Sequence, residues 1–181
     1  MPITVAAKNK QLIIIRQLMP ADTDALVTYL QQLSPETKSR FGPHAFDKET
    51  VVQFYKNPDV AGFIAEDVAT GSIIAYAIIK TGYLQHDSHR LQSYGLQLNS
   101  HTDCTFAPSV ADAWQGAGID GHLLTYILGW LRQHNIRRII LWGGVQAGNN
   151  RAVHYYQNKG FSKLGGFEYN GWNYDMILDI A

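Results

Sequence analysis

Cysteine, excess charge and long apolar runs are all scarce in this sequence. Cys104 is the single cysteine among 181 residues, so no internal disulfide can form and nothing indicates an oxidising compartment. Lys plus Arg total 15 and Asp plus Glu total 15, and this balance argues against broad electrostatic binding to nucleic acid or to an anionic membrane. The longest apolar run, Ile73 to Ile79, is far too short to cross a bilayer.

The chain nevertheless has enough apolar side chains to form a core, because 46% of its residues are hydrophobic and 17% are charged. Its first residues, MPITVAAKNKQ, lack the apolar stretch of a signal peptide. We find no repeat, low-complexity segment or linker. We therefore expect a single domain over residues 1–181, located in the cytoplasm.

Hydrophobic periodicity predicts strands mixed with helices. The expected strands are Leu12–Ile15, Gly62–Glu66, Ser72–Lys80, Asp103–Val110, Arg138–Val145 and two more within Phe161–Ile180, around the hairpin signal Asn170-Gly171. The expected helices are one opened by Pro20 and ended by Ser34-Pro35, then Phe46–Tyr55, Gly118–His134 and Asn150–Asn158. The polar Gly82–Asn99 segment is expected to be a loop or an extra edge segment. This order predicts a mixed α/β (α+β) fold.

A glycine-containing turn precedes the most regular amphipathic helix. The residues Gln115-Gly116-Ala117-Gly118-Ile119 let the backbone turn tightly, and the N–H groups of the first helical turn then form an anion site suited to a diphosphate. A purely structural turn is the alternative interpretation. A Rossmann dinucleotide site is disfavoured, because the turn lies past the middle of the chain and no acidic residue follows at the required spacing.

A second motif resembles a signature of the GNAT acetyltransferases. In that signature an Asn, an Ala three residues later, a Tyr four further on and a Gly-Phe pair correspond to Asn149, Ala152, Tyr156 and Gly160-Phe161. Gln115 and Gly118 match the family's other signature, in which Asp120 stands where Gly or Ala is preferred. The segment Leu33–Thr37 with Arg40-Phe41 is also similar to the start of some GNAT domains.

The resemblance implies a GNAT-like domain with a mixed, mostly antiparallel twisted sheet, helices on both faces and a splay between the two central strands. Pro108 and Gly143-Gly144 fit such a splay, because neither proline nor glycine supports a regular ladder; an ordinary bulge is the alternative. The implied cosubstrate is acetyl-CoA, with no metal. Its binding residues would be Ser109, Val110, Gln115, Gly116, Ala117, Gly118, Ile119, Asp120, Asn149 and Tyr156.

The resemblance also implies an N-acetyltransferase in which an amine attacks the thioester directly. Tyr156 would protonate the departing thiolate, because a phenol of pKa about 10 can donate a proton to the thiolate of a thiol of pKa about 8.5. Core packing is the alternative role of Tyr156. Asp103 is our candidate for the general base, with Glu66 and an exposed histidine such as His101 as alternatives. Cys104 is not expected to act as a nucleophile, because a buried thiol on a strand is usually inert.

Several questions stay open at this level. A non-catalytic acyl-CoA-binding or sensor module of the same fold is the main alternative function, and a domain binding another phosphate ligand is a minor one. The acceptor is a small-molecule or protein amine whose pocket we expect the Ser34–Phe46 loop and the Gly82–Asn99 segment to shape. A homodimer is compatible with the sequence. The histidines His86, His89 and His101 match no standard metal-site spacing.

Overall fold

The computed structural model describes residues 1–180, which form two compact units. One comprises residues 1–79 and 107–130, and the other comprises residues 80–106 together with the chain from Leu131 onward. Within the described residues nine strands form a sheet in the order β1-β2-β3-β4-β5-β6-β9-β7, and β8 pairs with β9. The β5–β6 pair is parallel, whereas the β1–β2, β2–β3, β6–β9, β7–β9 and β8–β9 pairs are antiparallel. The predicted mixed, mostly antiparallel sheet is confirmed.

The strands of the first unit are mostly those that the sequence predicts. They are β1 (Ile3–Ala6), β2 (Leu12–Gln17), β3 (Val60–Asp67) and most of β4 (Ile73–Thr81). In β4 every residue from Ile73 to Ile79 is buried, which is typical of a strand covered on both faces. Strand β1 was not predicted, because it is short and mostly exposed and gains its order by pairing with β2.

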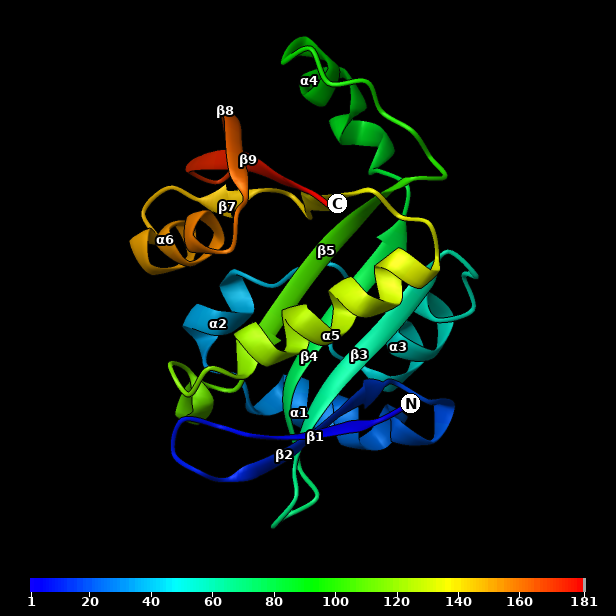
Figure 1. Ribbon diagram of the computed structural model, residues 1–181, viewed down its shortest axis with the longest axis vertical. Helices are drawn as coiled ribbons and strands as arrows, with labels where there is room; N and C mark the ends of the chain where they lie inside the picture. Colours follow the sequence, from blue (N-terminus) through cyan, green and yellow to red (C-terminus); the bar gives the residue numbers. More distant parts are fainter. Residues whose placement is uncertain (181) are drawn as a thin grey trace. The chain divides into compact units, whose positions relative to one another are not determined.

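Helices cover both faces of the sheet in this unit (Figure 1). They are η1 (Pro20–Asp22), α1 (Thr23–Gln32), α2 (Pro35–Ser39), α3 (Lys48–Phe54), η3 (Asp112–Trp114) and the larger part of α5 (Ile119–Gln133). Phe63 of β3 packs edge-on against Tyr126 of α5. Tyr76 of β4 instead contacts Tyr55, which caps the C-terminal end of α3. Side chains on adjacent strands therefore anchor helices on opposite faces.

Local capping accounts for where two of these helices begin. Asp47 caps α3 as predicted, accepting the N–H of Thr50 at 2.8 Å. Ser34-Pro35 was expected only to end the preceding helix, and α1 does end before it, at Gln32. The pair also starts α2, because the Ser34 hydroxyl accepts the Thr37 N–H and proline is suited to the first helical position.

The second unit contains the C-terminal hairpin, the helices η2, α4 and α6, and the last residues of α5. Its elements are η2 (Gln85–Asp87), α4 (Ser88–Ser93), the first half of β5 (Asp103–Val110), β6 (Arg138–Leu141), β7 (Val145–Gln146), α6 (Asn150–Asn158), β8 (Ser162–Glu168) and β9 (Trp172–Asp179). The hairpin predicted at Asn170-Gly171 is confirmed, and Asn170 takes the left-handed φ of 49° that such a turn requires. Asn135 after α5 is likewise left-handed, with φ of 58°.

The prediction that Gly82–Asn99 is a loop or edge segment was wrong, because it contains α4. Arg90 of α4 pairs with Asp175 of β9 at 2.7 Å and with Asp87 at 2.8 Å. Leu91 is buried in a cluster with Ile140 and Ile177. The contacts of Arg90 with Asp175 and of Leu91 with Ile140 and Ile177 join residues far apart in the chain, so the local polar composition of the segment did not indicate a helix.

The predicted Arg138–Val145 strand is interrupted. The parallel ladder joins Asp103 to Arg138 and ends with Phe106 and Leu141. Gly143 and Gly144 follow with positive φ values of 65° and 71°, conformations that favour glycine, and a separate strand β7 then begins. Strand β5 continues to Val110 beyond the last β5–β6 pair, and this is where the sequence predicts the strands to separate.

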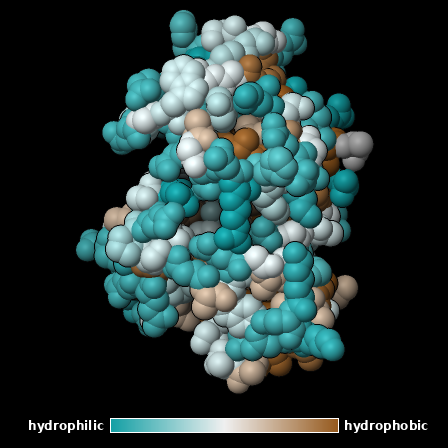
Figure 2. Space-filling view, turned by 90° about the vertical axis from the view of Figure 1, so that its left-hand side faces the viewer, coloured by the Kyte–Doolittle hydropathy of each residue, from teal (hydrophilic) through white to brown (hydrophobic). Residues whose placement is uncertain are grey.

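Hydrophilic side chains cover most of the face displayed in Figure 2. None of the helices formed by residues 1–180 combines the length and the apolar character that crossing a bilayer requires.

Candidate active site

The predicted site residues are divided between the two units. Ser109, Val110 and the turn from Gln115 to Asp120 belong to the first unit, whereas Asp103, Asn149 and Tyr156 belong to the second. Each group has a defined local geometry.

The glycine turn leads directly into the fifteen-residue helix α5. Gly116 and Gly118 have φ values of 83° and 84°, so both occupy the left-handed region that favours glycine. The turn is also tied to the β1–β2 connection, because the Lys8 N–H donates to the Ala117 carbonyl at 3.0 Å. The first N–H groups of an α-helix have no acceptor within the helix, so those of α5 that no side chain binds could donate to a ligand.

The Lys8 side chain lies against this turn. A Cβ atom placed on Gly118 would lie 3.4 Å from the nearest carbon of the Lys8 side chain, so the methylene groups of Lys8 pack directly on this glycine. The Lys8 ammonium and the positive end of the helix dipole would both favour an anion here. These features fit the diphosphate of coenzyme A. Lys8 was not singled out from the sequence, because it is 110 residues from Gly118 and only the fold brings it near.

Asp120, the departure from the family pattern, lies in the first turn of α5. Its carboxylate accepts the N–H of Gly121 at 2.9 Å. This bond uses one of the donors of the helix N-terminus and holds the carboxylate close to its own backbone. Asp120 therefore satisfies one N–H group in the first turn of α5.

A hydrogen-bonded cluster joins the residues before the glycine turn to the Ser34–Phe46 loop. The Asp112 carboxylate accepts the Ser34 N–H at 2.9 Å and the hydroxyl hydrogens of Ser34 and Thr37, each at 2.7 Å. The Gln115 side-chain amide donates to the Thr37 hydroxyl at 3.3 Å and to the Val110 carbonyl at 3.4 Å. Asp112 was not singled out from the sequence, where the only local sign of it is an acidic residue three positions before Gln115.

These hydrogen bonds to the charged form lower the pKa of Asp112 from 3.8 to about 2. Because the pKa of this carboxyl is lower in the folded protein than in the unfolded one, the ionised carboxylate stabilises the folded protein above its ordinary pKa. This contribution to the free energy of unfolding is lost as the pH falls through the pKa of the folded state. We expect Asp112→Asn to lower the denaturant midpoint near pH 7. The difference from the wild type should narrow as the pH falls from about 4 towards about 2.

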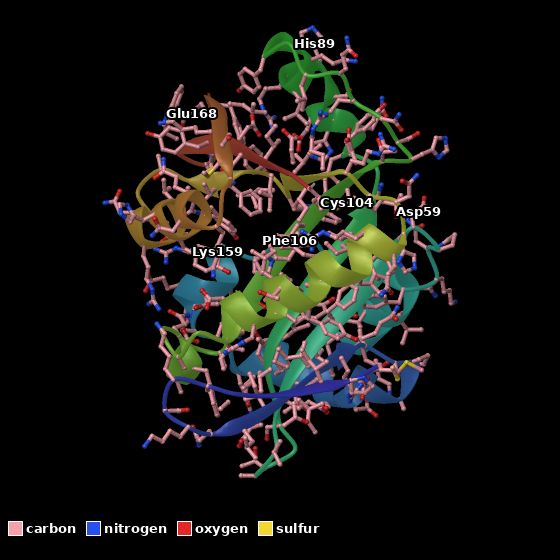
Figure 3. All side chains as sticks on the ribbon, in the orientation of Figure 1. Asp59, His89, Cys104, Phe106, Lys159 and Glu168 are labelled. Carbon is pink, nitrogen blue, oxygen red and sulfur yellow. The ribbon has the colours of Figure 1, made fainter. Side chains whose placement is uncertain are left out.

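Urea unfolding at a series of pH values measures this difference. Asp59→Asn is the matched control, because Asp59 is an exposed carboxylate in the loop before β3 (Figure 3) and should leave the midpoint unchanged. If the urea midpoints of Asp112→Asn and the wild type differed by the same amount across that pH range, the charge of Asp112 would not be what stabilises the loop.

Ser109 and Val110 lie at the end of β5. The Ser109 hydroxyl is buried, accepts the Tyr29 hydroxyl hydrogen at 3.0 Å and donates to the Tyr76 carbonyl at 3.4 Å. The Val110 carbonyl accepts from Gln115. A ligand along this part of β5 would therefore meet the backbone of Ser109 and not its side chain.

In the second unit, α6 holds Asn149 and Tyr156 in a defined relation. Asn149 caps the helix through its side-chain oxygen, which accepts the Ala152 N–H at 3.2 Å, so its NH2 group is the part suited to a ligand. Tyr156 is 9% exposed, and its ring packs against those of Tyr155 and Phe161 at centroid distances of 5.3 and 5.1 Å. The ring of Tyr156 is thus held in place by packing, and chemical and structural roles are compatible at this position.

Asp103 begins β5, where its buried carboxylate accepts the Asn99 N–H at 2.8 Å and lies 3.5 Å from the Arg138 guanidinium. Burial raises the pKa of this carboxyl, and the Asn99 hydrogen bond and the Arg138 charge oppose that rise. The other candidate carboxylate, Glu66, pairs with Arg16 at 2.8 Å. Both acids therefore have structural partners.

Cys104 lies beside Asp103 and is fully buried in β5, on the same strand as Phe106 (Figure 3). Burial raises the pKa of its thiol, which keeps it protonated and disfavours it as a nucleophile. His101 and His89 are exposed, and no group of three or more potential metal ligands occurs among residues 1–180.

Comparisons with known proteins agree with this architecture. Residues 26–161 match the model of the acetyltransferase (GNAT) family. No curated protein matches the sequence.

Solved structures share the fold at low identity. The GNAT domain of S. lividans PAT has a TM-score of 0.78 at 22% identity. The match covers 98% of this chain and 96% of that domain. A ribosomal-protein alanine acetyltransferase from Vibrio fischeri has a TM-score of 0.71 at 16% identity, with coverages of 99% and 94%. A spermidine N-acetyltransferase chimera from Vibrio cholerae and hSSAT has a TM-score of 0.66 at 21% identity, with coverages of 92% and 95%.

The family model spans most of the chain and includes both the glycine turn and α6. This chain belongs to the acetyltransferase (GNAT) family.

Proposed function

We propose that the protein is an N-acetyltransferase that moves the acetyl group of acetyl-CoA onto a primary amine by direct attack. The observation that carries this proposal is the turn from Gln115 to Ile119, in which two left-handed glycines lead into the N-terminus of α5 in a chain of this family.

On the coenzyme side, the backbone N–H groups at the start of α5 would bind the diphosphate, with Lys8 adding a positive charge. The backbone of Ser109 and Val110, past the last β5–β6 pair, would bind the pantetheine arm as a strand neighbour. The Asn149 NH2 group is a further donor.

On the chemical side, the amine nitrogen would form a bond to the acetyl carbon while the bond from that carbon to sulfur breaks. The Tyr156 hydroxyl would supply the proton that the sulfur takes as it leaves. Asp103 as the general base stays a prediction.

The acceptor would approach along the Ser34–Phe46 loop, which Asp112 ties to the turn of the coenzyme site. One structural neighbour is named as a spermidine N-acetyltransferase, and another is named as a ribosomal-protein alanine acetyltransferase. We therefore propose polyamines and protein N-termini as the first acceptors to test, together with lysine peptides, amino acids and drug amines.

Acetyl-CoA is expected to raise the melting temperature, because a ligand that binds only the native state stabilises it by mass action. At a hundred times its dissociation constant the gain is about 2.7 kcal/mol. Differential scanning fluorimetry with acetyl-CoA, and thiol detection with the amine panel, measure binding and turnover separately. No thermal shift at millimolar acetyl-CoA would contradict the proposed function. A shift without thiol release from any amine would favour the non-catalytic acyl-CoA-binding alternative.

A further inference from the structure

The connection between β1 and β2 lies against the glycine turn of the proposed coenzyme site. The Lys8 N–H donates to the Ala117 carbonyl at 3.0 Å, which holds the backbone of Lys8 beside the turn. The Lys8 side chain then packs on Gly118, because its Cε, Cγ and Cδ atoms lie 3.4, 3.5 and 3.8 Å from a Cβ atom placed on that glycine. The ammonium nitrogen is one bond beyond Cε. It therefore lies beside the residue that immediately precedes α5.

The connection is itself a tight turn with its own hydrogen bonds. The Ala7 N–H donates to the Gln11 carbonyl and the Lys10 N–H donates to the Ala7 carbonyl, each at 2.8 Å. The Gln11 N–H donates to the side-chain oxygen of Asn9 at 3.1 Å. These bonds restrict the backbone around Lys8, so its side chain is directed onto the glycine turn before any ligand binds.

The charge of Lys8 is available to a ligand. Lys8 is an exposed residue, and none of the ion pairs formed within residues 1–180 includes it. The carboxylate of Asp120 in the first turn of α5 accepts the N–H of Gly121 instead. A lysine can pack its methylene groups on the protein and keep its ammonium in water. Lys8 thus places an unpaired positive charge next to the glycine turn.

Coenzyme A carries two kinds of phosphate, which differ in the partner that suits them. The diphosphate fits the neutral backbone N–H groups at the start of a helix. The 3′-phosphate is a monoester on the ribose of the same nucleotide, and a phosphate monoester carries a charge of about −1.5 to −2 at pH 7. A lysine ammonium acts as a compact point charge, so it gains most from the phosphate with the larger charge.

We propose that Lys8 binds the 3′-phosphate of acetyl-CoA and makes the protein select this coenzyme over its dephospho form, an inference that rests on the proposed function. The N–H groups of α5 bind the diphosphate, and the ribose next to the diphosphate carries the 3′-phosphate to the Lys8 ammonium. Lys8 is a binding and specificity residue and takes no part in the chemical step.

The test compares acetyl-CoA with dephospho-acetyl-CoA, which lacks only the 3′-phosphate, by isothermal titration. The wild type should bind acetyl-CoA more tightly. Lys8→Met keeps a long side chain on Gly118 and removes the charge. It should weaken acetyl-CoA binding about 3- to 10-fold, the range between an exposed ion pair and a charge-assisted hydrogen bond. Its affinity for dephospho-acetyl-CoA, and its kcat at saturating acetyl-CoA, should match those of the wild type.

Ionic strength gives a second readout, which a purely structural role of Lys8 would not change. Salt screens the attraction between an exposed ammonium and a phosphate. The preference of the wild type for acetyl-CoA over the dephospho form should therefore fall as the salt concentration rises from about 0.05 M to about 0.5 M. In Lys8→Met the preference should be smaller and should depend less on salt.

Lys10→Met and Lys56→Met are the matched controls, because each removes the charge of one exposed lysine from the first unit. Both should change the preference for acetyl-CoA by less than Lys8→Met does. An equal loss of affinity for both coenzymes in Lys8→Met would mean that Lys8 binds the diphosphate, and this would overturn the inference. A wild type without a preference, or an unchanged preference in Lys8→Met, would overturn it too. A wild type that binds neither coenzyme would instead overturn the proposed function, before any variant is compared.

Discussion

Tyr156→Phe is expected to lower kcat by about 10²- to 10⁴-fold, the usual contribution of acid catalysis. The substitution keeps the ring that packs on Phe161 and removes only the hydroxyl. Stability should change by no more than about 1 kcal/mol, the net value of one hydrogen bond. Affinity for acetyl-CoA should also hold, because one contact to sulfur is a small part of the coenzyme footprint. Steady-state kinetics and calorimetric titration measure the two effects.

Tyr155→Phe is the natural control, because Tyr155 precedes Tyr156 on α6 and lies against its ring. It should retain nearly full turnover. Full activity in Tyr156→Phe would remove this residue from the mechanism. Loss of binding together with loss of turnover would instead mean that the hydroxyl positions the coenzyme.

Gly118→Glu is expected to abolish detectable acetyl-CoA binding. The change puts a side chain and a negative charge at the N–H groups that would hold the diphosphate, and a glutamate at φ of 84° is itself strained. The measurements are the thermal shift with acetyl-CoA and isothermal titration.

Two variants separate charge from strain. Gly118→Gln carries the same strain and size without the charge, so it should bind more tightly than Gly118→Glu. Gly129→Glu adds the same charge to the same helix at an exposed position with open space, and it should bind like the wild type. Normal binding by Gly118→Glu would mean that the turn is only structural.

The parts of the candidate site that the sequence predicted are local ones. Paired glycines before an amphipathic helix report a backbone conformation, and the left-handed φ values at Gly116 and Gly118 confirm the predicted turn. The helix that carries Tyr156 was predicted with the bounds Asn150–Asn158, and the structure has these bounds. Spacing within a single helix or turn can be recognised because few residues decide it.

The elements that the sequence missed depend on distant partners. Helix α4 is short and polar, and it is held by Arg90 pairing with Asp175, 85 residues away. Strand β1 forms because its backbone pairs with that of β2. Neither segment has a periodicity strong enough to predict its structure alone.

The sequence by itself predicted the mixed α/β fold class, the glycine turn and α6, because each depends on local backbone preference and side-chain periodicity. It indicated the family through the resemblance of two motifs to the GNAT signatures. Only the tertiary structure decided which polar groups meet. It placed Lys8 against Gly118, bound Ser34 and Thr37 to Asp112, gave Asp103 the partners Asn99 and Arg138, and aligned Tyr55, Tyr76 and His44. Burial and hydrogen bonding set the protonation of these groups, and both depend on neighbours that sequence spacing does not reveal.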